Sequence, residues 1–266
     1  MTAIRVGIGG WTFEPWRDNF YPARWPAKRE LEYASRHVTA IEVNGTFYSL
    51  MKPDNFARWH DETPEDFRFS LKATRYATNR RVLAEAGESI ERFIGSGLER
   101  LEAKLGPVLW QFAPTKKFEP DDFEAFLALL PPDVRGRPLR HVLEVRHASF
   151  MTPEFLALAR KYRMAVVITD SPVHPSFADL TTDFVYLRLV RAESHRPTGY
   201  APEVLDAWAA CAQAWARGDE PAGVPRIAPG PAPRAGEREV YMFMINGAKE
   251  RAPSAAMGVI ERLGGR

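Results

Sequence analysis

The sequence predicts a single α/β domain with the (β/α)8 architecture, the TIM barrel, and three observations support this fold class. Short apolar strands alternate with amphipathic helical segments along the whole chain, a pattern that gives a parallel sheet with crossover connections. Eight such strands are present, which favours a closed barrel over an open sheet. The length of 266 residues is also usual for one such barrel.

The predicted elements follow one another in a regular order. The eight strands are expected at residues 4–9, 40–44, 67–72, 108–112, 141–146, 165–170, 184–189 and 240–246. The helices are expected at residues 28–37, 53–61, 89–105, 120–130, 153–163, 201–216 and 254–263. Thr152 and Pro153 suit the N-cap and the first position of a helix. The crossover between the sixth and seventh strands is the weakest, because only the residues HPSFADL are available to form it.

One segment differs in composition from the rest of the chain. Residues 216–239, ARGDEPAGVPRIAPGPAPRAGERE, are rich in Pro, Ala and Gly, which is typical of a mobile loop. The segment joins a helix to the following strand, so it belongs at the end of the barrel away from the catalytic face. We therefore expect residues 1–266 to form one TIM-barrel domain with a mobile insertion at about 216–239.

Charge and composition exclude several classes of protein. The chain has 36 basic and 34 acidic residues and a formal net charge of +2; this charge does not support nucleic acid as a partner, although a local basic patch stays open. Cys211 is the single cysteine, so an intrachain disulfide and a zinc site of several thiolates are excluded. No apolar run approaches the ~20 residues of a membrane helix, and no signal peptide is expected. We expect a cytoplasmic protein without a membrane partner.

The common cofactor-binding loops are not found in the sequence. GIGG at 7–10 is followed by Trp-Thr-Phe-Glu-Pro and not by the start of a helix, which makes a dinucleotide site a weak interpretation. No GxxxxGK[ST] loop occurs. The cofactor is therefore unknown, and the sequence requires none.

The stretch AIEVNGTFY, residues 40–48, indicates where a functional site lies. Successive side chains of a strand point to opposite faces, and the face that meets the barrel helices must be apolar. Ile41 and Val43 are therefore expected to face the helices, and Glu42 and Asn44 to face the barrel interior.

The same alternation predicts which residues of the other strands face inward. Outward positions should be held by Phe67, Phe69, Leu71, Val108, Trp110, Phe112, Leu143, Val145, Val185, Leu187, Leu189, Tyr241, Phe243 and Ile245. Inward positions should be held by Arg5, Gly7, Gly9, Arg68, Ser70, Lys72, Gln111, Glu144, Arg146, Tyr186, Arg188 and Asn246. Gly7 and Gly9 would leave room inside the barrel, and His147 can also turn inward just after its strand.

Polar inward residues gather at the carboxyl ends of the strands, where barrel enzymes place their sites. The members of this group are Asn44, Lys72, Gln111, Arg146, Asp170, Arg188 and Asn246, with Glu42 and Glu144 one layer deeper. A structural interpretation is that three carboxylates and three cations neutralise one another. Buried ion pairs add little stability over apolar residues, so a binding or catalytic site is favoured.

A second candidate feature is the aromatic segment WTFEPWRDNFYPARWP, residues 11–26. Its three Trp residues follow no helical spacing. They are expected to pack over one rim of the barrel mouth, and the alternative is a stacking platform for a sugar or a base.

Several stretches together resemble the YecE-like family, also called domain of unknown function 72. They are VGIGGWTFEPWRDNFYP, IEVNGTFYSL, TPEDFRFSLK, LGPVLWQFAP, LEVRHASF, VITDSP, FVYLRL and YMFMINGAKERAPSAAM, spanning about residues 4–263. The resemblance implies a TIM barrel and no assigned activity. It also implies family roles for Glu42, Asn44, Thr46, Phe47, Tyr48, Lys72, Gln111, Glu144, Arg146, His147, Asp170 and Arg188. The chain departs from the family pattern after the seventh strand, where LVRAESHRPTGY stands, and at Asn246, where relatives have two Asn residues.

Three functions are compatible with these residues. The first is binding, and turnover in an enzyme, of a small polar or anionic ligand that carries phosphate or carboxylate. The second is a divalent-metal-dependent hydrolase or isomerase acting on a sugar phosphate or a nucleic acid. The third is a non-catalytic protein that binds a ligand or nucleic acid. The sequence does not decide between an enzyme and a binding protein.

The candidate catalytic residues are Glu42, Glu144, Asp170 and His147. Under the first function Glu42 or Glu144 is the general acid or base, and under the second all four are suited to a divalent ion. Ligand-binding roles fall to Asn44, Tyr48, Lys72, Gln111, Arg146, Arg188 and Asn246. No residue is assigned to a metal, because the three nearby cations would repel the ion. Replacing Glu144 with Gln should abolish turnover and leave the fold intact.

Overall fold

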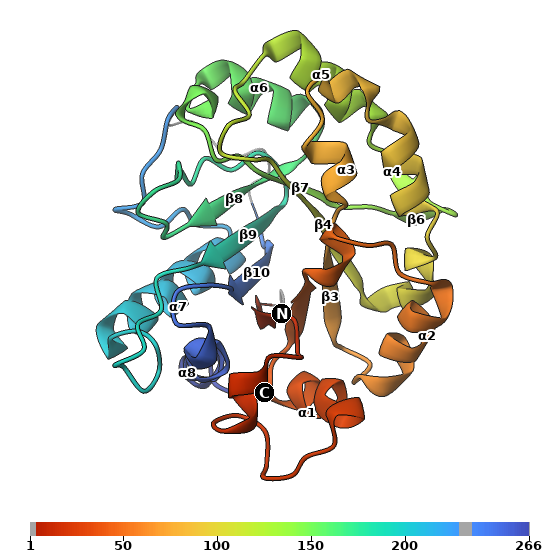
Figure 1. Cartoon of the computed structure of the whole chain (residues 1–266). Helices are drawn as coiled ribbons and strands as arrows, with labels where there is room; N and C mark the ends of the chain where they lie inside the picture. Colours follow the sequence, from red (N-terminus) through yellow and green to blue (C-terminus); the bar gives the residue numbers. More distant parts are fainter. Residues whose placement is uncertain (1–3, 229–235, 266) are drawn as a thin grey trace.

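Eight parallel strands close into a barrel in the computed structural model, which describes residues 4–228 and 236–265 (Figure 1). The strands are β1 (Ile4–Gly9), β2 (Ala40–Val43), β3 (Arg68–Lys72), β4 (Leu105–Gln111), β7 (His141–Glu144), β8 (Ala165–Thr169), β9 (Phe184–Leu189) and β10 (Glu239–Met244). They pair in the order β1-β10-β9-β8-β7-β4-β3-β2. A two-stranded hairpin, β5 (Asp133–Val134) and β6 (Arg137–Pro138), lies outside the barrel sheet. The predicted TIM barrel is confirmed.

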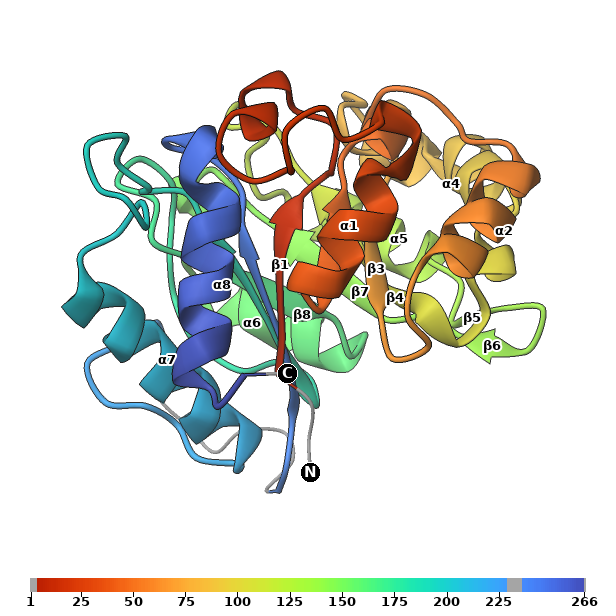
Figure 2. The ribbon, with the colours of Figure 1, turned by 90° about the horizontal axis from the view of Figure 1, so that it is seen from below.

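Helices surround the barrel, as Figures 1 and 2 show. They are α1 (Glu30–His37), α2 (Pro53–Glu62), α3 (Arg75–Thr78), α4 (Gly87–Ile94), α5 (Pro120–Leu129), α6 (Pro153–Lys161), α7 (Pro202–Ala216) and α8 (Ala252–Arg262). Thr152 caps α6 as predicted, because its hydroxyl accepts a hydrogen bond from the Phe155 N–H at 3.2 Å. None of the helices in these described ranges is long and apolar enough to cross a membrane.

The single helix predicted at 89–105 is wrong, because the structure divides it into α4 and a 3-10 helix at Leu98–Lys104. Gly97 lies between the two with a φ of 103°, a backbone conformation that favours glycine. A Cβ at this position would lie 2.7 Å from the Cβ of Pro53. The chain therefore turns here, at a residue that the helical pattern does not reveal.

The weak crossover between β8 and β9 contains no helix, and part of the Pro-rich segment packs there instead. The Ala178 N–H donates to the Pro225 carbonyl at 2.8 Å. The Asp179 carboxylate accepts the N–H groups of Ile227 and Ala228 at 2.7 and 3.0 Å. The insertion predicted at about 216–239 thus holds a defined position up to residue 228. Its mobility stays a prediction, and residues 229–235 lie outside the described residues.

Two apolar layers follow from the alternation along the strands. One buried cluster joins helix residues to outward strand residues such as Ile41, Val43 and Leu187. The other consists of residues from the barrel interior, among them Leu109 and Tyr186. The predicted alternation is confirmed for the apolar residues of β2, β3, β4, β7 and β9.

The alternation predicted for the eighth strand is wrong. Tyr241, Phe243 and Ile245 belong to the interior cluster, and the intervening methionines of β10 pack with the helices. The glycines of β1 explain the reversal, because a Cβ on Gly7 would lie 3.1 Å from Cδ1 of Phe243. Both faces of a barrel strand can be apolar, so the fit of volumes decided the orientation. The room left by the glycines is filled by side chains of β10.

Candidate functional site

The centre of the barrel mouth is an ion pair between β2 and β9. Arg188 Nε donates to Glu42 Oε2 at 2.9 Å, and Arg188 Nη2 donates to Glu42 Oε1 at 2.9 Å. Glu42 also accepts hydrogen bonds from the Tyr186 hydroxyl at 2.8 Å and from the Asn44 amide at 3.1 Å. Glu42 is 0 % exposed and Arg188 2 %. The predicted inward position of both residues is confirmed, and Glu42 serves as an ion partner of Arg188.

A second carboxylate, Glu144 at the end of β7, completes the network. It accepts hydrogen bonds from Arg188 Nη1 at 2.6 Å, from the Gln111 amide at 2.5 Å and from two nitrogens of Arg146 at 2.9 and 3.1 Å. Burial alone would raise the pKa of Glu144, but the two guanidinium groups and the amide lower it to about 2. Glu144 therefore stays ionised at neutral pH and has no proton to deliver.

Tyr186 and Ser70 form the layer beneath these charges. The Ser70 hydroxyl lies 2.7 Å from the Tyr186 hydroxyl and also reaches the Pro107 carbonyl. Burial raises the pKa of Tyr186 well above its usual value. Both residues were expected inside the barrel from the alternation, but neither was assigned to the site. The contacts of Tyr186 with Glu42 and with Ser70 could not be seen in the sequence, because they join strands far apart in the chain.

Lys72, at the end of β3, differs from every other charged group of the mouth. It is 7 % exposed, and its Nζ forms no hydrogen bond or ion pair with any described residue. The ammonium instead lies 4.1 Å from the centroid of the Phe47 ring. Burial first, and Arg188 second, lower the pKa of Lys72 to about 8.

A second buried lysine of the chain provides the contrast. Lys104 is 5 % exposed and donates to the carbonyls of His60 and Thr63 at 2.5 and 2.7 Å. Its three donors have partners within the protein, as buried ammonium groups usually require. Lys72 therefore differs from most buried lysines, whose ammonium groups donate hydrogen bonds to acceptors within the protein.

Asp170 does not join this network, although the sequence placed it in the mouth. Ala165 and Val167 of β8 face the interior, so Asp170 follows the strand on its outer side. Its carboxylate accepts the Val190 N–H at 2.6 Å and the Tyr200 hydroxyl at 2.9 Å. Burial raises its pKa. Asp170 lines a separate pocket of about 330 Å³ with Tyr200 and residues of α7.

Three further predicted residues lie around the mouth without contacting the carboxylates. His147 caps the short helix Ala148–Phe150, its Nδ1 accepting the Ser149 N–H at 3.1 Å. Tyr48 is 60 % exposed at the rim. Asn246 is exposed after β10, and its inward assignment depended on the alternation that is wrong for that strand. One residue without a predicted role, His174, lies close to Arg146, which together with burial lowers its pKa.

The geometry does not favour the divalent-metal alternative. The guanidinium of Arg188 lies between Glu42 and Glu144, bonded to both, where a metal would have to bind. Within residues 4–228 and 236–265, no group of three or more His, Cys, Asp or Glu side chains is placed to hold an ion.

The aromatic segment at 11–26 packs against the barrel, as the first interpretation expected. Trp16 is fully buried, and its ring contacts Phe13 and Phe20 edge to face at 5.5 and 6.2 Å. Phe20 in turn packs on Tyr33 of α1 at 5.4 Å. These rings cover one another, which leaves little face for stacking a sugar or a base.

Comparison with known proteins identifies the family. Residues 5–266 match the family described as "Protein of unknown function DUF72". The chain is 29% identical over 150 residues to the UPF0759 protein YecE of Escherichia coli K12, covering 55% of this chain and 50% of that protein. It is 28% identical over 157 residues to the UPF0759 protein YunF of Bacillus subtilis 168, covering 57% and 54%. The matches span about half the length of these relatives.

A solved structure shows the same fold. The crystal structure of a DUF72 family protein from Thermotoga maritima superimposes with a TM-score of 0.74 at 21% identity, covering 98% of this chain and 99% of that one. At this level of identity the likeness concerns the fold alone. The resemblance to the YecE-like family, first indicated by the strand-end motifs, is confirmed by the match over residues 5–266. The chain belongs to the DUF72 family.

Proposed function

We propose that this DUF72 protein binds a small ligand through a phosphate or carboxylate group at the barrel mouth, with Lys72 and Arg146 as the anchoring cations. The observation that carries the proposal is the ammonium of Lys72, a residue 7 % exposed, which has no hydrogen-bond or ion-pair partner among the described residues and lies near carboxylates whose oxygens are already bonded. An anion would supply the hydrogen-bond acceptors that Lys72 lacks.

The charge balance of the mouth supports an anion over a cation or a neutral ligand. With Asp170 outside the network, the carboxylates of Glu42 and Glu144 face three cations, Arg188, Arg146 and Lys72. The group therefore carries an excess positive charge when Lys72 is protonated. The purely structural interpretation required equal numbers of carboxylates and cations in the mouth, and the two numbers differ.

The cations differ in their ability to reach a ligand. Arg188 is committed to both carboxylates and is 2 % exposed, so we assign it to holding the network together. The Arg146 side chain is 20% exposed; its Nε and Nη2 bond to Glu144, and its Nη1 has no hydrogen-bond partner within the described part of the chain. Lys72 is 7 % exposed, so only the anionic end of a ligand would contact it.

Binding is the function that this geometry supports best, and any turnover would involve Lys72. Glu144, with a pKa of about 2, is unsuited to act as a general acid or base near neutrality. Lys72, with a pKa of about 8, is within the range where a group can both accept and release a proton. A catalytic role would therefore shift from the carboxylates to the lysine.

Titration calorimetry with inorganic phosphate and with malonate tests the proposal. We expect saturable binding that Lys72→Met weakens at least about tenfold, since a hydrogen bond to a charged group contributes about 1.5–3 kcal/mol. Lys249→Met is the matched control, because Lys249 also lies over an aromatic ring, Phe13 at 4.7 Å, but outside the charge network. No binding of either anion, or equal binding by the Lys72 variant, would overturn the proposal.

A further inference from the structure

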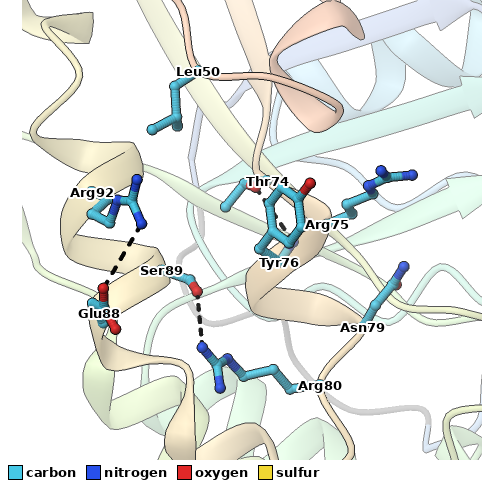
Figure 3. Close-up of a pocket in the computed structure, with 9 residues that line it drawn as sticks. All are labelled: Leu50, Thr74, Arg75, Tyr76, Asn79, Arg80, Glu88, Ser89 and Arg92. Atoms are coloured by element: carbon cyan, nitrogen blue, oxygen red, sulfur yellow. Dashed lines mark hydrogen bonds and ion pairs between the residues drawn. The ribbon is translucent and has the colours of Figure 1, made fainter.

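We propose that the pocket between α3 and α4 is a second binding site, which takes a mononucleotide: its phosphate on the arginines and its base on Tyr76. The pocket has a volume of about 860 Å³ and is lined by Leu50, Thr74, Arg75, Tyr76, Asn79, Arg80, Glu88, Ser89 and Arg92 (Figure 3). This site is independent of the anion site at Lys72, which does not line the pocket.

The charge of the lining points to an anion. Three arginines, Arg75, Arg80 and Arg92, line the pocket with a single carboxylate, Glu88. Glu88 lies 3.8 Å from Arg92 Nη1, a weak contact between exposed groups. Three arginines and one carboxylate in the lining leave an excess of positive charge, which a phosphate would neutralise with charge-assisted hydrogen bonds.

Arg80 shows that donors in this pocket are unused. Its Nη2 donates to the Ser89 hydroxyl at 3.2 Å, but its Nε is buried and has no hydrogen-bond partner. A buried donor without a partner is rare in folded proteins. The guanidinium of Arg80 therefore keeps unused donor capacity, and a phosphate in the pocket would accept hydrogen bonds from its terminal nitrogens. Figure 3 shows the Arg80 side chain extending toward Ser89 on α4.

The base of the proposed nucleotide is inferred from the exposed tyrosine rings beside the pocket. Tyr76 is 60 % exposed and lies between Arg92 and Arg75 in Figure 3. The guanidinium carbon of Arg75 is 5.4 Å from the centroid of the Tyr76 ring and 5.7 Å from that of Tyr48. A flat base would find here the combination of aromatic and guanidinium planes on which bases stack, and the exposed side chain of Leu50 adds an apolar wall.

The extent of the pocket favours a mononucleotide over a nucleic acid strand. Its volume lies within the ~300–1,000 Å³ typical of small-molecule sites. A strand needs a basic groove that follows several phosphates, whereas the formal net charge of the whole chain is only +2. The chain also has no GxxxxGK[ST] loop, so recognition would depend on side chains and not on a glycine-rich backbone cradle.

Calorimetric titrations with adenosine monophosphate, inorganic phosphate and adenosine test this site part by part. We expect the nucleotide to bind at least about tenfold more tightly than either half. Arg92→Ala should weaken the nucleotide and phosphate at this pocket, and leave adenosine unchanged. Tyr76→Ala should weaken the nucleotide and adenosine, and leave phosphate unchanged. Both side chains are exposed, so the variants should fold.

The matched control is Arg58→Ala. Arg58 forms an i,i+4 pair with Glu62 at 3.7 Å and is 62% exposed, close to the 69% of Arg92 in its pair with Glu88. This control should bind the nucleotide like the unaltered protein, and so should Lys72→Met, which separates this pocket from the anion site at the mouth.

Three results would overturn the nucleotide site. The first is a nucleotide affinity no greater than that of phosphate in Lys72→Met, which lacks the anion site at the mouth; this would leave a simple anion site in the pocket. The second is that Lys72→Met loses nucleotide binding whereas Arg92→Ala binds the nucleotide like the unaltered protein. This result would place the ligand in the barrel mouth. The third is tight binding of a ten-residue single-stranded oligonucleotide, steeply weakened by salt, without measurable binding of the mononucleotide.

Discussion

Arg188 donates two parallel hydrogen bonds, both 2.9 Å long, to the two carboxylate oxygens of Glu42. This bidentate geometry is the strongest that a guanidinium and a carboxylate can adopt. Neither residue is accessible to a ligand, because they are 2 % and 0 % exposed. The pair therefore forms the base of the site, on which Glu144, Arg146 and Lys72 are arranged.

Glu42→Gln should lower the free energy of unfolding by about 3–5 kcal/mol, the usual cost of removing one partner of a buried ion pair. Gln cannot accept both donors of Arg188 and the Tyr186 hydroxyl at once. Urea denaturation followed by circular dichroism measures the change. Glu32→Gln, at the exposed pair with Arg29, is the control and should cause a much smaller loss. Equal losses in the two variants would contradict this account of the network.

Glu144→Gln should also destabilise the fold, contrary to what its strand-end position suggests. The carboxylate accepts hydrogen bonds from Arg188, Arg146 and Gln111, and an amide replaces one acceptor oxygen with a donor. Thermal unfolding monitored by circular dichroism should show a lower midpoint than for the unaltered protein. An unchanged midpoint would mean that the network contributes little to stability.

The two buried lysines should respond in opposite ways to substitution by Met. Lys104→Met removes the donor of the Thr63 carbonyl, at about 1–3 kcal/mol for a buried group left unsatisfied, and one of the donors of the His60 carbonyl, which keeps the Thr63 hydroxyl. Lys72→Met removes an ammonium without a hydrogen-bond partner, so the free energy of unfolding should stay unchanged or rise. Chemical denaturation of both variants provides the test, and a large loss in Lys72→Met would show that the lysine is structural.

The lowered pKa of Lys72 predicts a rise of stability with pH. The pKa of Lys72 is about 8 in the folded protein, compared with the ordinary value of 10.5 that applies to the unfolded chain. Between pH 8 and 10.5 the unfolded chain therefore binds more protons than the folded protein. Stability therefore increases as the pH rises from about 8 to 10.5, by up to about 3 kcal/mol. The difference in unfolding free energy between the unaltered protein and Lys72→Met isolates this contribution. A flat difference over this range would mean that Lys72 titrates normally.

His141 makes a corresponding prediction on the acid side. Its Nδ1 accepts the Trp110 indole N–H at 3.0 Å and its Nε2 lies 2.8 Å from the Pro131 carbonyl, a pattern that suits the neutral ring. Burial lowers its pKa to about 4. Between pH 6.5 and 4 the unfolded chain binds the extra proton, so stability falls as the pH falls. In His141→Gln the fall between pH 6.5 and 4 should be smaller, as measured by denaturation at each pH.

Asp179 should control the position of residues 217–228. Its carboxylate accepts the N–H groups of Ile227 and Ala228, the contacts that hold the segment against the crossover between β8 and β9. Asp179→Ala should speed hydrogen exchange of these two amides. Asp219→Ala, at an exposed residue of the same segment, should leave exchange unchanged. Equally fast exchange in the unaltered protein would mean that the segment is not held there.

Much of the fold could be predicted because it depends on periodic patterns. The alternation at Ile41, Glu42 and Val43 allows one orientation of the strand in a barrel, since only the apolar face can meet the helices. The sequence of β10 allows two orientations of the strand, because Tyr241 and Met242 are both apolar enough to face either the helices or the barrel interior. That choice depended on space beside the glycines of another strand.

The positions of the candidate site residues were predicted with mixed outcomes. Strand-end positions brought Lys72 and Arg188 to the barrel mouth with Glu42 one layer deeper, because parallel strands bring their carboxyl ends together. The position of Asp170 was wrong because it follows a strand whose facing residues are all apolar, so the pattern did not reveal its side.

The sequence by itself determined the barrel, the strands that form it and the polar layer at its mouth, because alternation and helix punctuation are properties of neighbouring residues. Only the tertiary structure decided which charges meet. Glu42 and Arg188 are 146 residues apart in the chain, and the packing that joins them leaves Lys72 without an ion-pair partner among the residues that the structure describes. Pairing energy between charges depends on distance and burial, and both are set by the closure of the barrel.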